Sequence, residues 1–189
     1  MTSHIEGGHV EFYNHRTGER KRFPFHSFLE QYYNLLFELV SGSTVTITDT
    51  SGVAQPGANT GRSSTMMQFN AASADNTHGI QLGTGTAANT SATYALSALI
   101  ANGVGAGNLV YGASSTSAPT FAAPNFQMVM TRTFTNSSGG DITVNEIALV
   151  ANYVSTYEFM ITRDVISGGF LIPSGDTVTA TVTMSYAIA

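Results

Sequence analysis

The sequence contains no cysteine and no tryptophan in its 189 residues. Without cysteine, a disulfide framework, a thiolate zinc site and a cysteine nucleophile are all excluded. Charged residues are also scarce: they make up 10% of the chain, against roughly 25% in an average globular protein. No apolar run reaches the roughly 18 residues that indicate a transmembrane helix, so we expect no membrane span.

The few charges have an acidic balance, with a net charge of −5 and a pI of about 5.4. This balance argues against nucleic acid as the main partner. The first residues, MTSHIEGGHVEF, lack the basic and then apolar pattern of a signal peptide. We therefore expect synthesis and folding in a cytoplasm, without export.

Apolar residues are abundant at 42% of the chain, and Ser, Thr, Gly, Ala and Asn are frequent among the others. This composition differs from that of a disordered chain, which combines high net charge with few apolar residues. It indicates a β-rich protein whose outer faces carry hydroxyl groups in place of ions. Such faces are common in proteins that pack against copies of themselves or against partners. The length suits one domain.

Residues 1–25 differ from the rest because they hold four of the seven basic residues: Arg16, Arg20, Lys21 and Arg22. The segment could be a hairpin that turns at HRTGE, with Gly18 suited to a positive φ. It could equally be an extended arm reaching roughly 80 Å, far enough to contact a neighbouring subunit. We divide the chain into an N-terminal arm, residues 1–25, and a single β-rich domain, residues 26–189.

The segment HSFLEQYYNLLFELVSGS predicts a helix over residues 28–41. Ser27 and Glu30 have the spacing of a capping box, and Gly42 supplies a stop. The apolar face is very wide, and it contains Phe28, Leu29, Tyr32, Tyr33, Leu35, Leu36, Phe37, Leu39 and Val40. Because a helix of about 14 residues is marginal in water, we expect this one to be buried on two sides, against the domain and against a second chain.

Most of the remaining chain predicts strands separated by turns. The last run is the clearest: in residues 177–188, Val178, Ala180 and Val182 alternate with threonines. Around Asn145–Glu146 the apolar phase slips by one residue, which indicates a β-bulge. The segment TYALSALIANG, residues 93–103, predicts a second, short helix. The expected fold is mainly β: an antiparallel β-sandwich or jelly roll with one N-terminal helix and a short second helix.

Four motifs resemble catalytic or cofactor sites without completing them. GTGTAA, residues 83–88, matches G-x-G-x-x-A, but no helix is expected to open at its glycines, as a dinucleotide site requires. Asp49-Thr50-Ser51 lacks the glycine of the aspartic-protease turn and occurs once, so an Asx-type turn is expected. His78 and Asp75 lack a nucleophile elbow. The histidines of the first 26 residues match no compact zinc spacing. We therefore expect no enzyme, no cofactor and no metal.

Arg132 and Arg163 each lie within a predicted strand of a chain that is almost bare of positive charge. A buried arginine must be paired, and Asp164, Glu146 and Glu158 are candidate partners. We interpret both arginines as members of cross-strand or intersubunit ion pairs. The basic RTGERKR segment, residues 16–22, is interleaved with Glu19, and we interpret it as a solvated turn or an ion-pairing surface rather than a phosphate site.

Several blocks of the chain resemble small virion structural proteins of tailed bacteriophages. These blocks are HSFLEQYYNLLFELV, VTITDTSG, HGIQLGTGT, YALSALIANGVGAGNLVYG, TRTFTNSSGGDITVNEIALV and TRDVISGGFLIPSGDTVTATVTMSYAI. The resemblance extends over nearly the whole chain from Phe25. It implies a structural protein of the virion, made in the host bacterial cytoplasm, that binds copies of itself and the major capsid protein or other virion proteins. Trimers are common in the class.

A capsid decoration or cement protein is the favoured function, and a tail, neck or fibre-attachment component is the alternative. A carbohydrate-binding β-sandwich is the second alternative, for which Tyr153 and Tyr157 are the exposed-looking aromatic pair. The residues expected at interfaces are Arg16, Arg20, Lys21, Arg22, Phe28, Tyr32, Tyr33, Phe37, Arg132 and Arg163.

Overall fold

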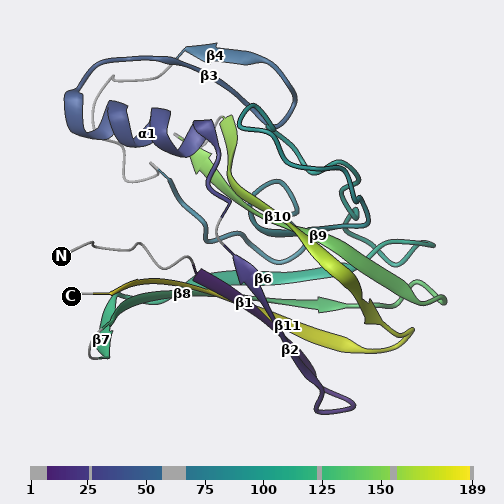
Figure 1. The fold of residues 1–189 in the computed structure, drawn as a ribbon. Coiled ribbons are helices and arrows are strands. Elements are labelled where there is room, and N and C mark those ends of the chain that lie inside the picture. The colour runs from purple at the N-terminus through teal and green to yellow at the C-terminus, as the bar shows by residue number, and fades with distance from the viewer. Residues whose placement is uncertain (1–7, 26, 57–66, 123–124, 154–156, 188–189) are drawn as a thin grey trace.

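The protein is mainly β, with antiparallel sheets and one helix (Figure 1). The computed structural model describes residues 8–25, 27–56, 67–122, 125–153 and 157–187. The elements are β1 (Gly8–Asn14), β2 (Arg20–Phe25), α1 (Glu30–Ser41), β3 (Thr46–Thr48), β4 (Ala54–Pro56), β5 (Gly79–Gly83), β6 (Val110–Thr116), β7 (Thr120–Ala122), β8 (Asn125–Thr135), β9 (Ile142–Tyr153), β10 (Tyr157–Ile172) and β11 (Thr177–Ala187).

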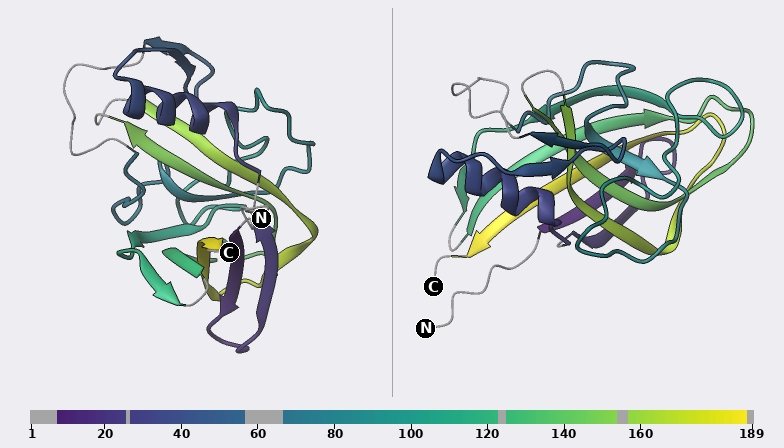
Figure 2. Two further views of the ribbon diagram at one scale, coloured as in Figure 1. Left: turned by 60° about the vertical axis from the view of Figure 1, so that its left-hand side comes forward. Right: turned by 90° about the horizontal axis from the view of Figure 1, so that it is seen from above.

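Two sheets form the body of the molecule. The larger has the order β2-β1-β11-β8-β6, with β7 also paired to β8, and the smaller has the order β10-β9-β5. Strands β3 and β4 make a separate two-stranded sheet beside α1 at one end of the molecule (Figures 1 and 2). In β11, Val178, Ala180 and Val182 are buried and alternate with threonines, as the sequence predicts.

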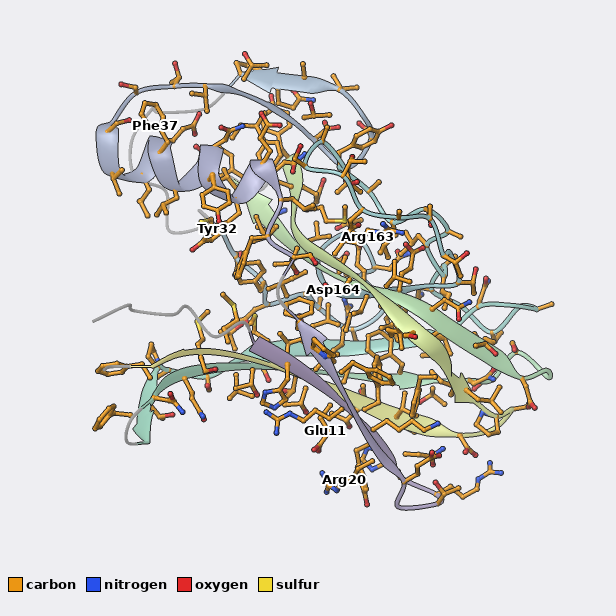
Figure 3. All side chains as sticks on the ribbon, in the orientation of Figure 1. Glu11, Arg20, Tyr32, Phe37, Arg163 and Asp164 are labelled. Atoms are coloured by element: carbon orange, nitrogen blue, oxygen red, sulfur yellow. The ribbon has the colours of Figure 1, made fainter. Side chains whose placement is uncertain are left out.

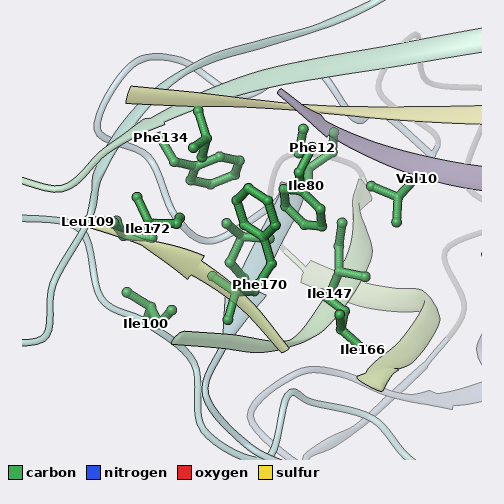
Figure 4. Close-up of a cluster of buried hydrophobic side chains, with 14 of the residues drawn as sticks. Val10, Phe12, Ile80, Ile100, Leu109, Phe134, Ile147, Ile166, Phe170 and Ile172 are labelled. Atoms are coloured by element: carbon green, nitrogen blue, oxygen red, sulfur yellow. The ribbon is translucent and has the colours of Figure 1, made fainter. Parts of the chain in front are cut away.

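The main hydrophobic core lies between the two large sheets, with side chains from both (Figure 4). Phe12 of β1 stacks on Phe170 of β10 with a centroid distance of 4.7 Å, and Tyr111 meets the edge of Phe134 at 4.9 Å. Full burial of side chains of this size contributes about 1.5–3 kcal/mol each. The Phe12–Phe170 contact joins the two sheets, whereas Tyr111 and Phe134 pack against each other within the larger sheet.

The N-terminal segment is a hairpin within the larger sheet, so the expectation of an arm separate from the β-domain is corrected for residues 8–25. Strand β1 pairs with β2 on one side and with the C-terminal strand β11 on the other. Val10 and Phe12 are completely buried in the core. The turn between the strands includes Gly18 at φ 73°, as expected. Residues 1–7, including His4 and Glu6, and also His26, lie outside the described residues.

The predicted irregularity at Asn145–Glu146 is confirmed. Ile142 and Val144 enter the core in one phase, and Ile147 and Leu149 enter it in the other. The extra residues belong to the partner strand: Val165 pairs with Glu146 and Phe170 with Val144, which leaves residues 166–169 of β10 opposite Asn145. Because of this bulge, β9 buries core residues both before and after the change of apolar phase.

The helix begins later than the sequence predicts. Leu29 takes the N-cap position without a side-chain capping bond, so the expected capping box is wrong. The Ser27 hydroxyl instead donates to Asp164 of β10 at 2.5 Å, and Phe28 forms a β-bridge with Thr162. These bonds hold the chain extended where a capping box would have started the helix. The helix ends as predicted, with Gly42 at φ 70°.

The second helix expected over residues 93–103 does not form. The backbone of Ile100 donates to Leu82 of β5, and Ala98 accepts from Thr84, so this part of the segment is bridged to the sheet. The Ala98 N–H also donates to the carboxylate of Glu146. These long-range bonds use the backbone groups that a helix would have paired internally.

Candidate functional site

One face of α1 carries large apolar side chains that do not pack against the rest of the described chain. Tyr33, Leu36, Phe37 and Val40 are exposed, and Tyr33 and Val40 retain 61% and 73% of their accessible surface. Figure 3 shows Phe37 on the side of the helix opposite to Tyr32. Because these four residues follow i, i+3, i+4, i+7 spacing, they form one stripe. We call them the α1 stripe.

The opposite side of α1 anchors the helix to the body of the protein. Leu35 packs in a cluster with Ile47 of β3 and Phe159 of β10. The buried carboxylate of Glu38 accepts hydrogen bonds from the Tyr153 hydroxyl and from the backbone N–H of Val45, both at 2.9 Å. These contacts fix the orientation of the helix, so the α1 stripe faces away from the body of the protein.

The aromatic residues expected at an interface divide between these two sides. Phe28 and Tyr32 are partly buried, contact each other with tilted rings at a centroid distance of 4.7 Å and pack against the cluster around Leu35. Tyr33 and Phe37 are exposed. The expectation that α1 packs against the domain is confirmed, whereas a second covering chain stays a prediction.

The basic residues of the β1–β2 hairpin are largely paired within the chain. Arg16 binds Asp176 at 2.6 Å and Lys21 binds Glu19 at 3.2 Å. On the outer face of the sheet, Arg20 forms an ion pair with Glu11 (Figure 3). These contacts agree with the expectation of an ion-pairing turn. They leave little uncompensated positive charge for an acidic partner.

Arg22 approaches a histidine in place of a carboxylate: its guanidinium lies 2.7 Å from Nδ1 of His9. Partial burial lowers the pKa of His9, and the charge of Arg22 lowers it further. Neutral His9 then accepts a hydrogen bond from Arg22. Arg22 also has a second effect, because it lies with Arg20 and Pro24 in the edge strand β2. Charged residues and proline in an edge strand discourage pairing with another sheet.

Arg132 is buried within the chain, which corrects the expectation that it lies at an interface or in an ion pair. Its guanidinium stacks over the Tyr111 ring at 4.7 Å. It donates to backbone carbonyls of Ala72, Asp75, His78, Ile80 and Gly112. Arg132 thus supplies hydrogen-bond donors to backbone carbonyls outside the strand pairing. Because Arg132 belongs to β8, these bonds attach the segment before β5 to the larger sheet.

Arg163 and Glu146 form a buried ion pair on adjacent strands, one of the pairings that the sequence left open, with 2.6 Å between Nη2 and the carboxylate. Their side chains are 1% and 0% exposed, so Arg163 is not an interface residue. The carboxylate also accepts from the backbone N–H groups of Gly85, Ser97 and Ala98. Burial alone would raise the pKa of Glu146, but the hydrogen bonds from Ala98 and Ser97, together with Arg163, outweigh it and hold the pKa below its ordinary value.

This ion pair explains the glycine-rich loop, because the loop is attached to it. A Cβ on Gly85 would come within 1.8 Å of the Ser97 hydroxyl oxygen and 2.6 Å of Glu146. Arg163 binds the carbonyl of Ala87 at 2.8 Å and the side chain of Asn89. The glycine motif therefore serves close packing, and no helix opens at it, as expected.

A cavity of about 410 Å³ lies near Glu158, and it is lined by Thr50, Asn76, Thr77, Gln81, Ala95, Leu96, Leu99 and Glu158. Burial raises the pKa of Glu158, and Asp75 and Asp49 raise it further. Among the described residues of the lining, Glu158 is the only ionisable one. These residues therefore include no pair of groups suited to proton transfer or to activation of a nucleophile.

The other motifs have structural positions. Asp49 accepts hydrogen bonds from the backbone N–H groups of Ser51 and Val53, so it forms the expected Asx-type turn. His78 lies 3.3 Å from Asp75 and close to the carbonyl of Asn70. Among the described residues, no group of three histidine or acidic side chains is placed to hold a metal ion.

The aromatic pair expected for a carbohydrate site is not exposed. Tyr153 is buried and bonded to Glu38, and Tyr157 packs near Phe159 at 6.3 Å. A different pair is exposed, Phe121 and Phe126, which the sequence analysis did not single out and which contact each other at 5.0 Å across β7 and β8. Their cross-strand pairing could have been found only after the register of this hairpin was known.

Comparison of the chain with family models, with curated proteins and with solved structures found no match. In the described part of the chain, no helix has the length and apolar character needed to cross a membrane. Any functional interpretation therefore depends on the residues of this chain.

Proposed function

We propose that the protein is a structural component of a bacteriophage virion, a capsid decoration or cement protein that binds other virion chains through the α1 stripe. The observation that carries the proposal is the exposure of this stripe on a helix whose other side is firmly anchored. Exposed apolar patches of several hundred Å² mark interaction sites in soluble proteins. The partners are copies of this chain and the major capsid protein or other virion proteins.

The arrangement of charge supports an assembly role over catalysis. The buried ionisable groups Arg132, Arg163 and Glu146 bind loops to strands. Two antiparallel sheets enclose the main core, and this arrangement supports our proposal of a β-sandwich as the building block. Hydroxyl pairs such as Ser115 with Thr131, at 2.9 Å, lie on the larger sheet in addition to the ion pairs of the β1–β2 hairpin. A tail, neck or fibre-attachment component would use the same contact at another place in the particle.

Substitution of Phe37 by glutamate should remove the protein from the particle without unfolding it. Phe37 is 46% exposed, so the loss in the free energy of unfolding should be about 1 kcal/mol, too little to unfold the domain. A charge placed in the contact must be desolvated, so we expect the copy number in purified virions to fall at least about 10-fold. Quantitative mass spectrometry of the particles measures this number.

Val104→Glu is the control, because Val104 is also an exposed apolar residue, 65% against 46% for Phe37, but lies outside α1. Its copy number should equal that of the wild type. If the wild-type chain is missing from purified virions, the proposed function is wrong. Electron microscopy of the same particles distinguishes a head position from a tail position.

A further inference from the structure

The α1 stripe has the dimensions of one half of a helix pair. Helix α1 contains 12 residues, so it is about 18 Å long. Leu36 and Phe37 lie at the middle of the stripe, with Tyr33 one turn before them and Val40 one turn after them. Apolar residues at this spacing form a seam along one side of a helix, and the side chains of two such seams can interdigitate.

The apolar area fits a compact contact between two copies. With side-chain areas of about 150–250 Å² each, the stripe and the neighbouring Leu39 expose roughly 500 Å². A standard protein interface buries about 800 Å² on each partner. The stripe can therefore form the apolar centre of a modest interface, and a polar margin around the helix can supply the remainder.

The charges on α1 restrict what can cover it and in which direction. Its acidic residues are Glu30, exposed in the first turn, and Glu38, which is buried, and the last turn has no basic residue. A suitable occupant thus presents an uncharged apolar surface, and α1 itself has one. Two parallel helices would bring the two Glu30 side chains together, whereas antiparallel helices separate them and align opposite dipole ends.

We propose that a second copy of this chain covers the stripe, with the two α1 helices antiparallel about a two-fold axis. Leu36 and Phe37 then lie at the axis and meet their counterparts. Tyr33 of one copy lies opposite Val40 of the other, and this contact occurs twice because a two-fold interface is self-complementary. The inference rests on the proposed function, since it names the occupant of the same surface.

A charge exchange along the stripe tests the pairing and its direction. Tyr33→Glu and Val40→Lys each place a charge opposite an apolar side chain and should weaken the dimer at least about 100-fold. The double variant Tyr33→Glu/Val40→Lys should restore dimerisation, because each introduced glutamate then faces an introduced lysine of the other copy. Both charges suit the helix dipole at their positions, so the helix should remain folded.

Sedimentation equilibrium of the purified protein measures the dissociation constant, and circular dichroism confirms that each variant is folded. The wild type and Val104→Glu should be dimers, the single variants monomers and the double variant a dimer. A double variant as weak as the single variants overturns the antiparallel arrangement. A wild-type trimer, or single variants that remain dimers, overturns the two-fold contact.

Two further outcomes distinguish self-pairing of the chain from its proposed role in the virion. If the wild type is a monomer at all concentrations and Phe37→Glu is still lost from virions, another virion protein covers the stripe. Self-pairing is then wrong while the virion role stands. If the wild type is a dimer but is missing from virions, the pairing stands and the virion role is wrong.

Discussion

A chain that lacks residues 1–24 is expected to lose its fold. These residues include β1, which pairs with β11 at six positions from His9↔Thr183 to Asn14↔Val178. Val10 and Phe12 are fully buried, and Phe12 stacks on Phe170. Truncation of one buried Phe to Ala already costs about 3–5 kcal/mol, and a whole domain is stable by only about 5–15 kcal/mol. Thermal unfolding followed by circular dichroism should show no cooperative transition.

The matched control keeps the hairpin and removes only its surface charges. Glu11→Gln/Arg20→Gln deletes an ion pair on the outer face of the sheet, and exposed pairs contribute at most about 1 kcal/mol. This variant should unfold cooperatively, close to the wild-type temperature. If the truncated chain remains soluble and unfolds at the wild-type temperature, the hairpin is a dispensable arm and its place in the core is wrong.

Replacement of Arg163 by methionine should lower the free energy of unfolding by about 3–5 kcal/mol, because it leaves the buried carboxylate of Glu146 without its counter-charge. It also removes the bonds from the guanidinium to Ala87 and Asn89, so the loop over residues 84–98 loses part of its attachment. Chemical denaturation measures the first effect, and hydrogen exchange of the Ser97 and Ala98 amides measures the second.

Acid provides an independent test of the same ion pair. Since the pKa of Glu146 is lower in the folded chain than its ordinary 4.5, its stabilising contribution is complete above pH 4.5. The contribution is lost as the pH falls through the folded value. Glu146→Gln should flatten this part of the dependence of stability on pH. An Arg163→Met variant that loses less than about 1 kcal/mol would show that the pair is solvated.

Local patterns predicted the parts of the fold that local forces determine. The alternation in β11 gave the correct core face because side chains in a strand point to opposite sides in turn. The slip at Asn145–Glu146 was visible because the apolar residues change phase there. The pairing of Arg163 with Glu146 was among the predicted options because a buried charge needs a partner in a chain with few of them.

The remaining features depend on contacts between distant residues. Ser27 has a capping sequence, but Asp164, 137 residues away, takes its hydroxyl. The periodicity of residues 93–103 favours a helix, but Glu146 and β5 bind their backbone. Arg132 donates hydrogen bonds to five backbone carbonyls, and the distribution of charges in the sequence does not reveal such partners. No sequence pattern shows whether a local or a long-range hydrogen-bond partner is favoured at these residues.

The expectation that the helix packs against the domain is confirmed, and its covering by a second chain stays a prediction. Leu35 and Glu38 face the body, and the residues on the other side stay exposed. The proposal of an assembly role depends on this division, because a helix buried on all sides would need no partner.

The most direct test is hydroxyl-radical labelling of Tyr33 and Phe37 in purified virions and in dilute free protein, with the exposed Tyr94 as reference. If other chains cover the α1 stripe in the particle, labelling of Tyr33 and Phe37 should fall several-fold there, while labelling of Tyr94 changes less. Equal labelling of Tyr33 and Phe37 in both samples would contradict an assembly role for this surface.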